Sequence, residues 1–158
     1  MVDQVGPAGI DASGMVRLGG EVLAPCRLGM NELRALPQHE REITFTCRKS
    51  GARRHRFSGP LLLEVLSLAG PLFIPGERKD RLRFLISLQA ADGHRVILSW
   101  AEIDPEFANR PVLLGVSRDG TGLDGEGPQL VMPDDVCGAR NLSGVTDLRV
   151  FSALDKRS

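Results

Sequence analysis

Hydrophobic and polar residues alternate along several stretches of the chain, which is the pattern of strands that bury one face. In residues 42–47 the apolar side chains of Ile43, Phe45 and Cys47 fall on one face, and Thr44 and Thr46 fall on the other. Residues 82–88 alternate in the same way, and a turn at 91–94 predicts that they form a hairpin with residues 95–100. Further strands are predicted at 15–23, 112–116, 130–132 and 145–151.

Two short segments have helical spacing instead. Met30, Leu33 and Leu36 recur at helical intervals before Pro37, and residues 61–68 form an apolar run that Pro60 and Gly70 bracket. The segments at 25–27, 76–80 and 119–127 are predicted loops. Strands outnumber helices and no long repeat is present, so the predicted class is α+β, with mixed, mostly antiparallel sheets and a few short helices.

The length of the chain and the positions of its glycine-rich and proline-rich segments predict one domain. Residues 1–14 are rich in glycine and proline and show no period, which predicts a flexible N-terminal arm. Residues 15–152 form the predicted domain, and 153–158 form a C-terminal tail. A chain of 158 residues can bury a sufficient core without disulfides or structural metal.

Charge and composition exclude several classes of protein. Twenty basic and twenty acidic residues cancel, so no global field attracts nucleic acid or an anionic membrane. No apolar run approaches the roughly 18 residues of a membrane helix, and no leader-like segment opens the chain. We therefore expect a cytoplasmic protein without nucleic-acid or membrane partners. The odd set Cys26, Cys47 and Cys137 is widely spaced, which favours reduced thiols.

The most concentrated charge follows Cys47. Residues 48–56 read Arg-Lys-Ser-Gly-Ala-Arg-Arg-His-Arg and predict a basic turn. This run is either a local anion site or a solvated hairpin turn. His39, His55 and His94 lack partners at metal-binding spacing, so we expect surface or satisfied histidines. His55 alternates with basic residues, which favours a strand at the end of this run. Asp134 and Asp135 follow a proline, where aspartates usually cap a turn. Serine-hydrolase, zinc-protease and nucleotide-binding motifs are absent from the sequence.

Several of these segments together resemble a known family. Residues 43–47 (Ile-Thr-Phe-Thr-Cys), Arg53-Arg54 and the run 57–70 are similar to the strand, cysteine turn and helix of the sulfite-oxidase-type molybdopterin-binding domain. Segments 33–37, 91–94, 99–105, 127–133 and 138–140 are similar as well. The resemblance extends from about residue 15 to residue 151 and implies the corresponding fold.

The resemblance also implies a chemistry. Cys47 would be the catalytic residue and the thiolate ligand of a mononuclear molybdenum held by molybdopterin, and the domain would perform oxygen-atom transfer. Arg53, Arg54 and Arg140 would contact anionic groups of the cofactor or substrate, and Gly138 would let the backbone approach the pterin. The resemblance also implies a small oxyanion or sulfoxide-like substrate and an electron-transfer partner. Basic neighbours should lower the pKa of the Cys47 thiol.

The chain departs from that family in ways that keep two alternatives open. It largely lacks the additional chain that encloses the cofactor in complete enzymes, and it has no haem segment or second β-sandwich domain. One alternative is a relative without cofactor that acts as a binding or partner-interaction module. The other is a thiol redox sensor that uses Cys47 without metal, with a resolving cysteine nearby.

Overall fold

The computed structural model describes residues 14–47 and 51–155, except for the side chains of Thr46 and Cys47. Residues 1–13 of the predicted arm and 156–158 of the predicted tail lie outside the described residues. The same holds for Arg48 and Lys49 of the basic run. The domain boundaries therefore stay predictions.

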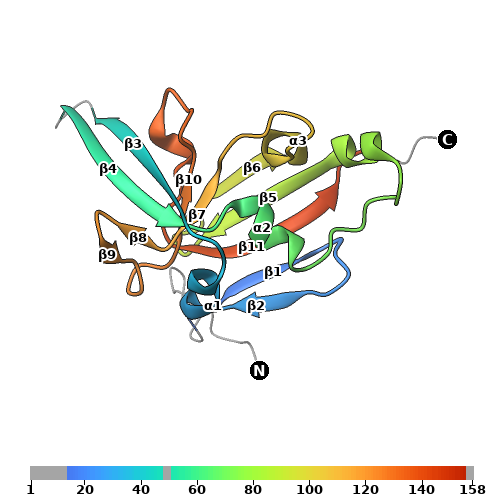
Figure 1. Cartoon of the computed structure of the whole chain (residues 1–158), viewed down its shortest axis with the longest axis horizontal. Coiled ribbons are helices and arrows are strands. Elements are labelled where there is room, and N and C mark those ends of the chain that lie inside the picture. The colour runs from blue at the N-terminus through green and yellow to red at the C-terminus, as the bar shows by residue number, and fades with distance from the viewer. Residues whose placement is uncertain (1–13, 48–50, 156–158) are drawn as a thin grey trace.

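A five-stranded sheet forms the centre of the molecule, in the order β2-β1-β11-β5-β6 (Figure 1). Its strands are β1 (Val16–Gly20), β2 (Cys26–Leu28), β5 (Phe84–Ala90), β6 (Arg95–Ser99) and β11 (Val145–Ser152). Strand β1 runs parallel to β11, and every other neighbouring pair is antiparallel. The predicted hairpin between the strands at 82–88 and 95–100 is present as β5 and β6.

One face of this sheet carries the main core. Every second residue of β5 is buried, and Phe84, Ile86 and Leu88 are fully inaccessible to solvent. Helix α2 (Leu62–Ser67) contributes Leu62 and Leu66 to the same cluster, so it covers this face. The predicted helix at 61–68 and the alternation at 82–88 are thus confirmed, because each buries the apolar residues that its period puts on one side.

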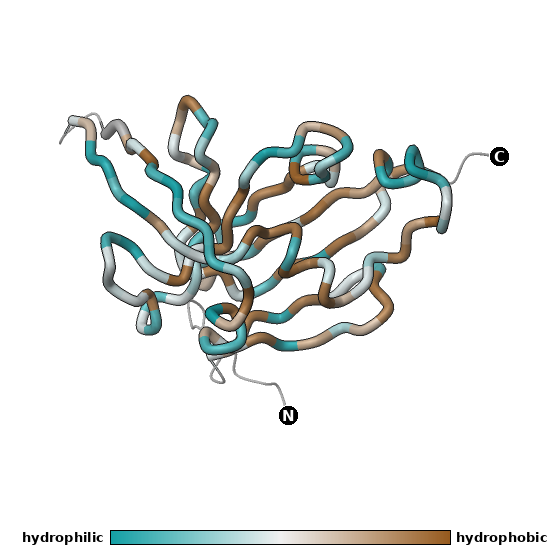
Figure 2. Tube along the Cα trace, viewed as in Figure 1, coloured by the Kyte–Doolittle hydropathy of each residue, from teal (hydrophilic) through white to brown (hydrophobic). Residues whose placement is uncertain are grey.

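A second sheet stands beside the first, in the order β3-β4-β8-β9. It comprises β3 (His39–Cys47), β4 (Gly51–Gly59), β8 (Ser117–Arg118) and β9 (Thr121–Gly122). Strands β7 (Leu113–Gly115) and β10 (Gln129–Val131) pair with each other, and β7 contacts β4. Apolar residues from both units form a small second core: Ile43, Phe57, Leu113, Leu123 and Val131. Figure 2 shows that β4 is mostly hydrophilic, whereas β5 is largely hydrophobic.

Short helical turns join these strands. They are α1 (Met30–Ala35), α3 (Trp100–Ile103) and the 3-10 turns η1 (Arg78–Arg83) and η2 (Gly138–Arg140). The helix predicted near residues 31–36 is confirmed as α1. No helix among the described residues is both long and apolar enough to span a bilayer.

The α+β class, with mostly antiparallel sheets, is confirmed, but four local predictions are wrong. Most of the predicted basic turn at 48–56 belongs to strand β4, because its backbone pairs with β3 along its whole length. Residue 26, predicted in a loop, begins β2, and the predicted loop at 119–127 contains β9. The predicted loop at 76–80 runs into η1.

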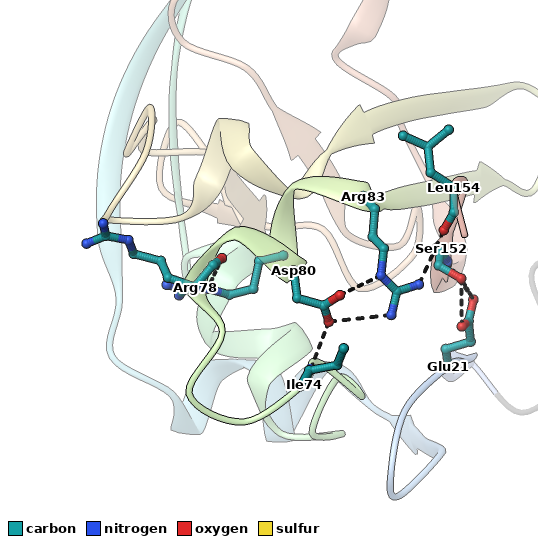
Figure 3. Close-up of polar contacts among 8 residues, drawn as sticks. Glu21, Ile74, Arg78, Asp80, Arg83, Ser152 and Leu154 are labelled. Atoms are coloured by element: carbon teal, nitrogen blue, oxygen red, sulfur yellow. Dashed lines mark hydrogen bonds and ion pairs between the residues drawn. The ribbon is translucent and has the colours of Figure 1, made fainter. Parts of the chain in front are cut away.

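Turn η1 is held by a partly buried ion pair, shown in Figure 3. Arg83 Nε donates to Asp80 Oδ1 at 2.6 Å, and Asp80 Oδ2 accepts the backbone N–H of Ile74 at 2.8 Å. Glu21 nearby accepts from the backbone and hydroxyl of Ser152. These contacts connect η1 to the start of β5 and hold the end of β11. They explain why part of the segment 76–80, predicted to be a charged loop, forms a helical turn.

Candidate functional site

The two arginines predicted to act together point to opposite faces of the β3–β4 hairpin. Arg53 lies directly across from Phe45, and Arg54 lies across from Thr44. Cross-strand partners share a face, and successive residues alternate faces. Both arginines are exposed and have no ion-pair partner within the described residues. Only Arg53 therefore shares the face on which Phe45 lies, and the two guanidinium groups are not brought together.

Cys47 ends strand β3, where its backbone pairs with Gly51. This position agrees with the predicted strand end. The side chain of Cys47 lies outside the described residues, so its predicted roles as catalytic residue and molybdenum ligand stay predictions. The same is true of its predicted low thiol pKa.

Three aromatic rings line the inner face of the hairpin. The Phe45 ring centroid is 5.9 Å from that of His55 and 6.3 Å from that of Phe57. His55 Nδ1 lies 2.7 Å from Asp119 Oδ2, so this histidine has a carboxylate partner. The backbone N–H of Arg56 and then His55 lower the pKa of Asp119. His55 is thus a satisfied histidine that links β4 to the β8–β9 turn.

Gly138, predicted to approach a pterin, packs against Phe45. A Cβ atom at residue 138 would lie 2.7 Å from the Phe45 Cδ1 atom, far inside van der Waals contact. Turn η2 therefore lies directly on the face of β3 that carries Phe45. Cys137 is exposed and immediately precedes this contact, so the segments bearing Cys47 and Cys137 meet at the same end of β3. Cys26 lies on β2, and burial raises the pKa of its thiol.

The guanidinium of Arg140 is occupied by two carboxylates. Its Nε and Nη2 atoms donate to Asp135 Oδ2 and Oδ1, each at 2.8 Å, and its Nη1 donates to Glu102 Oε1 at 3.1 Å. The hydrogen bonds from Arg140 lower the pKa of Asp135. Asp135 was expected only to cap a turn, and no signal in the sequence links it to a glutamate in another element. The role of Arg140 toward a cofactor stays a prediction.

Glu102 connects this cluster to a cleft. Its Oε1 atom also lies 3.7 Å from Arg110 Nη1, which is farther than from Arg140. Arg110 lines a cleft of ≈ 370 Å³ between the start of β3, the start of α2 and residues 103–112. The apolar lining is supplied by Leu61, Leu63, Ile103, Pro105, Pro111 and Val112, and the polar lining by His39, Arg41, Asn109 and Arg110.

The polar lining of the cleft is basic. Arg41 Nη1 donates to the neighbouring Glu40 carbonyl at 2.6 Å, and Arg41 has no carboxylate partner within the described residues. His39 Nε2 is buried and makes no hydrogen bond, although Glu64 Oε1 lies 3.5 Å away. We take this contact as electrostatic only, because the distance and direction do not suit a hydrogen bond.

Sequence reasoning missed this cleft. It expected His39 to be a surface or satisfied histidine, and it singled out neither Arg41 nor Arg110. One signal was present: residues 39 and 41 have the same parity as Ile43 and therefore fall on its face of the strand. The cleft could not be inferred from that signal, because residues 103–112 come from a distant part of the chain.

No group of three or more histidine, cysteine or acidic side chains is placed to hold a metal among the described residues. This finding does not bear on the predicted molybdenum centre. The resemblance implies that the protein supplies a single thiolate ligand, Cys47. The side chain of Cys47 lies outside the described residues.

Comparison with known proteins gives the fold alone. No protein-family model matches the chain, and no curated protein matches it in sequence. Among solved structures, the sulfane dehydrogenase SoxCD from Paracoccus pantotrophus superposes with a TM-score of 0.68 at 16% sequence identity. The match covers 87% of this chain and 38% of that chain. The chain therefore shares a fold with part of a larger sulfur-compound dehydrogenase.

Proposed function

We propose that this chain is a binding module that takes a small amphipathic anion, a carboxylate on an apolar body, in the cleft beside β3. One observation carries the proposal: His39, Arg41 and Arg110 line the cleft and no carboxylate does. A lining with both basic and apolar residues is complementary to a ligand with a charged head and an apolar body.

The two parts of such a ligand would meet different residues. Arginine presents a planar fork of donors that matches a carboxylate, and Arg41 has no competing acidic partner within the described residues. Leu63 and Val112 belong to the apolar lining, which favours a hydrocarbon body. A volume of ≈ 370 Å³ is at the low end of the range for ligand pockets, so a small aromatic acid fits with room to spare.

His39 adds a second reason to expect a polar ligand. A buried polar atom without a partner costs about 1–3 kcal/mol relative to one that is hydrogen-bonded. Nε2 of His39 makes no hydrogen bond within the described residues, and its nearest acidic group, Glu64 Oε1, lies 3.5 Å away. A carboxylate oxygen in the cleft would supply the missing hydrogen bond.

The groups expected to hold a cofactor have other partners. Arg140 donates three hydrogen bonds to Asp135 and Glu102, and Gly138 packs against the Phe45 ring. A cofactor at these residues would first have to displace those partners. This arrangement favours the binding module over the molybdopterin enzyme.

The molybdopterin-dependent oxidoreductase is the second candidate. It is favoured by the position of Cys47 at the end of β3 and by the fold shared with a dehydrogenase. When bound, the cofactor would supply oxygen-atom transfer to or from a small oxyanion or sulfoxide-like substrate. Arg53, exposed and without a partner in the described chain, is the residue best placed to attract an anionic group. Molybdenum content distinguishes the two candidates.

Calorimetric titration with benzoate tests the proposal, and benzyl alcohol serves as the uncharged analogue. We expect benzoate to bind and benzyl alcohol to bind much more weakly. Arg41→Gln should weaken benzoate binding about tenfold or more, because a hydrogen bond to a charged group contributes roughly 1.5–3 kcal/mol. Arg54→Gln removes an exposed charge of the same kind on the outer face of the hairpin and should leave affinity unchanged.

Three results would contradict the proposal. They are no heat of binding with benzoate, equal affinity for the alcohol and the acid, and equal affinity in the parent and Arg41→Gln. The melting temperature of each variant is measured in parallel, so that a loss of folding is distinguished from a loss of the site.

A further inference from the structure

The five-stranded sheet leaves one of its faces uncovered by the other described elements. Helix α2 and the main core lie against the face that carries Ile86 and Leu88 (Figure 1). Side chains that alternate with these point to the opposite side and are partly or fully exposed. Charged side chains are unevenly distributed over this open face.

A single row of polar side chains crosses all five strands of the open face. Residues directly opposite one another in neighbouring strands point to the same side of a sheet. The register places five residues in line, in the strand order β2-β1-β11-β5-β6: Arg27, Arg17, Asp147, Gln89 and Arg95. Arg149 stands two residues beyond Asp147 on β11 and faces the same side.

The charges in this row do not cancel. Arg17 Nε donates to Asp147 Oδ1 at 2.7 Å, and its Nη2 donates to Oδ2 at 3.2 Å, so this aspartate is already engaged. Arg27, Arg95 and Arg149 are exposed and have no carboxylate partner within the described residues. Three uncompensated arginines thus gather on one face of a chain whose formal net charge is zero.

The same face also has a hollow and an exposed apolar side chain. Arg17, Arg27 and Arg149 surround a shallow hollow of ≈ 460 Å³, and a Cβ at Gly19 on its floor would meet no atom within 4 Å. Ile97 lies on the same side of β6 as Arg95, and 58% of its surface is exposed. Arginines around exposed aliphatic side chains are typical of protein interfaces.

We infer that this face docks an acidic protein surface, whose carboxylates pair with Arg27, Arg95 and Arg149 while an apolar side chain covers Ile97. Charge complementarity of this kind raises the association rate and fixes the orientation of the partner. A phosphate backbone fits less well, because it offers no apolar side chain to cover the exposed Ile97. The face is distinct from the carboxylate cleft, so the inference does not depend on the proposed function.

Binding of a fluorescein-labelled poly-L-glutamate peptide at low ionic strength tests the inference. The variant Arg27→Glu/Arg149→Glu reverses two of the unpaired charges. We expect its dissociation constant for the peptide to rise by about tenfold or more, since like charges brought together oppose docking. The matched control Arg54→Glu/Lys79→Glu changes net charge equally, at exposed residues away from the face, and should bind nearly as the parent does.

An NMR spectrum of the arginine Nε–Hε groups shows which arginines contact the peptide. Addition of the peptide should shift the signals of Arg27 and Arg149, and the signal of Arg54 should stay in place. Equal weakening in the two double variants, or unchanged signals for Arg27 and Arg149, would overturn the inference. Tighter binding of duplex DNA than of poly-L-glutamate, lost in the same variant, would overturn it in favour of nucleic acid.

Discussion

The five-stranded sheet and the β3–β4 hairpin are both built from paired strands but differ in what they bury. Sheet strand β5 buries every second side chain, with Phe84, Ile86 and Leu88 fully inaccessible. In the hairpin, Ile43 and Phe57 are buried near its base, and β4 is exposed from Gly51 to Arg54.

This difference divides the fold into a part that carries most of the stability and a part that contributes less. The free energy of folding resides mainly in the sheet and its helix, because burial of apolar area is the dominant favourable contribution. Beyond the small second core around Ile43 and Phe57, the hairpin and the loop that packs on it are held by individual contacts, such as Phe45 with Gly138 and Arg140 with Asp135. Such contacts can be changed one at a time without loss of the fold.

The largest effect is expected in the sheet. Leu88→Ala should lower the free energy of unfolding by about 3 kcal/mol, since truncation of a buried leucine creates a cavity. Thr44→Ala on the exposed side of the hairpin should change it by no more than about 0.5 kcal/mol. Chemical denaturation of both variants measures the difference. Similar losses in the two would contradict the assignment of stability to the sheet.

The Gly138 contact should give the next effect. Gly138→Ala should cost about 1–3 kcal/mol, because the new Cβ overlaps the Phe45 ring. In a Phe45→Ala background the same change should cost much less, and a double-mutant cycle measures this coupling. Gly125→Ala is the control, since a Cβ there meets nothing within 4 Å. Additive effects at 45 and 138 would show that the glycine has another role.

The Arg140 cluster should give a smaller effect that depends on pH. Arg140 lowers the pKa of Asp135 in the folded state, so the ionised carboxylate stabilises the fold above the unfolded pKa of about 3.9. That contribution is lost as pH falls through the lower folded-state pKa. Arg140→Gln should therefore cost about 1 kcal/mol at neutral pH and have a flatter stability profile in acid. Parallel acid profiles of variant and parent would refute the pairing.

The sequence predicted regular structure better than it predicted the site. Periodicity identified β5 and α2, because each has one buried face that fixes its pattern. It failed at β4, where Arg53 and Arg54 occupy both faces of a strand that is exposed near its turn. The resemblance named Gly138 and Arg140, but their contacts depend on Phe45 and Glu102, which lie far away in the chain. The cleft residue Arg110 was missed for the same reason.

We propose that this fold serves here as a binding module without a metal cofactor. The molybdenum content of the protein is the most direct test of that proposal. The protein is produced in a host that synthesises molybdopterin, and metal and pterin are measured in the parent chain and in Cys47→Ser. We expect far less than one molybdenum per chain in both forms, with benzoate binding intact. Stoichiometric molybdenum and pterin in the parent, with the metal lost in Cys47→Ser, would contradict it and establish the oxidoreductase.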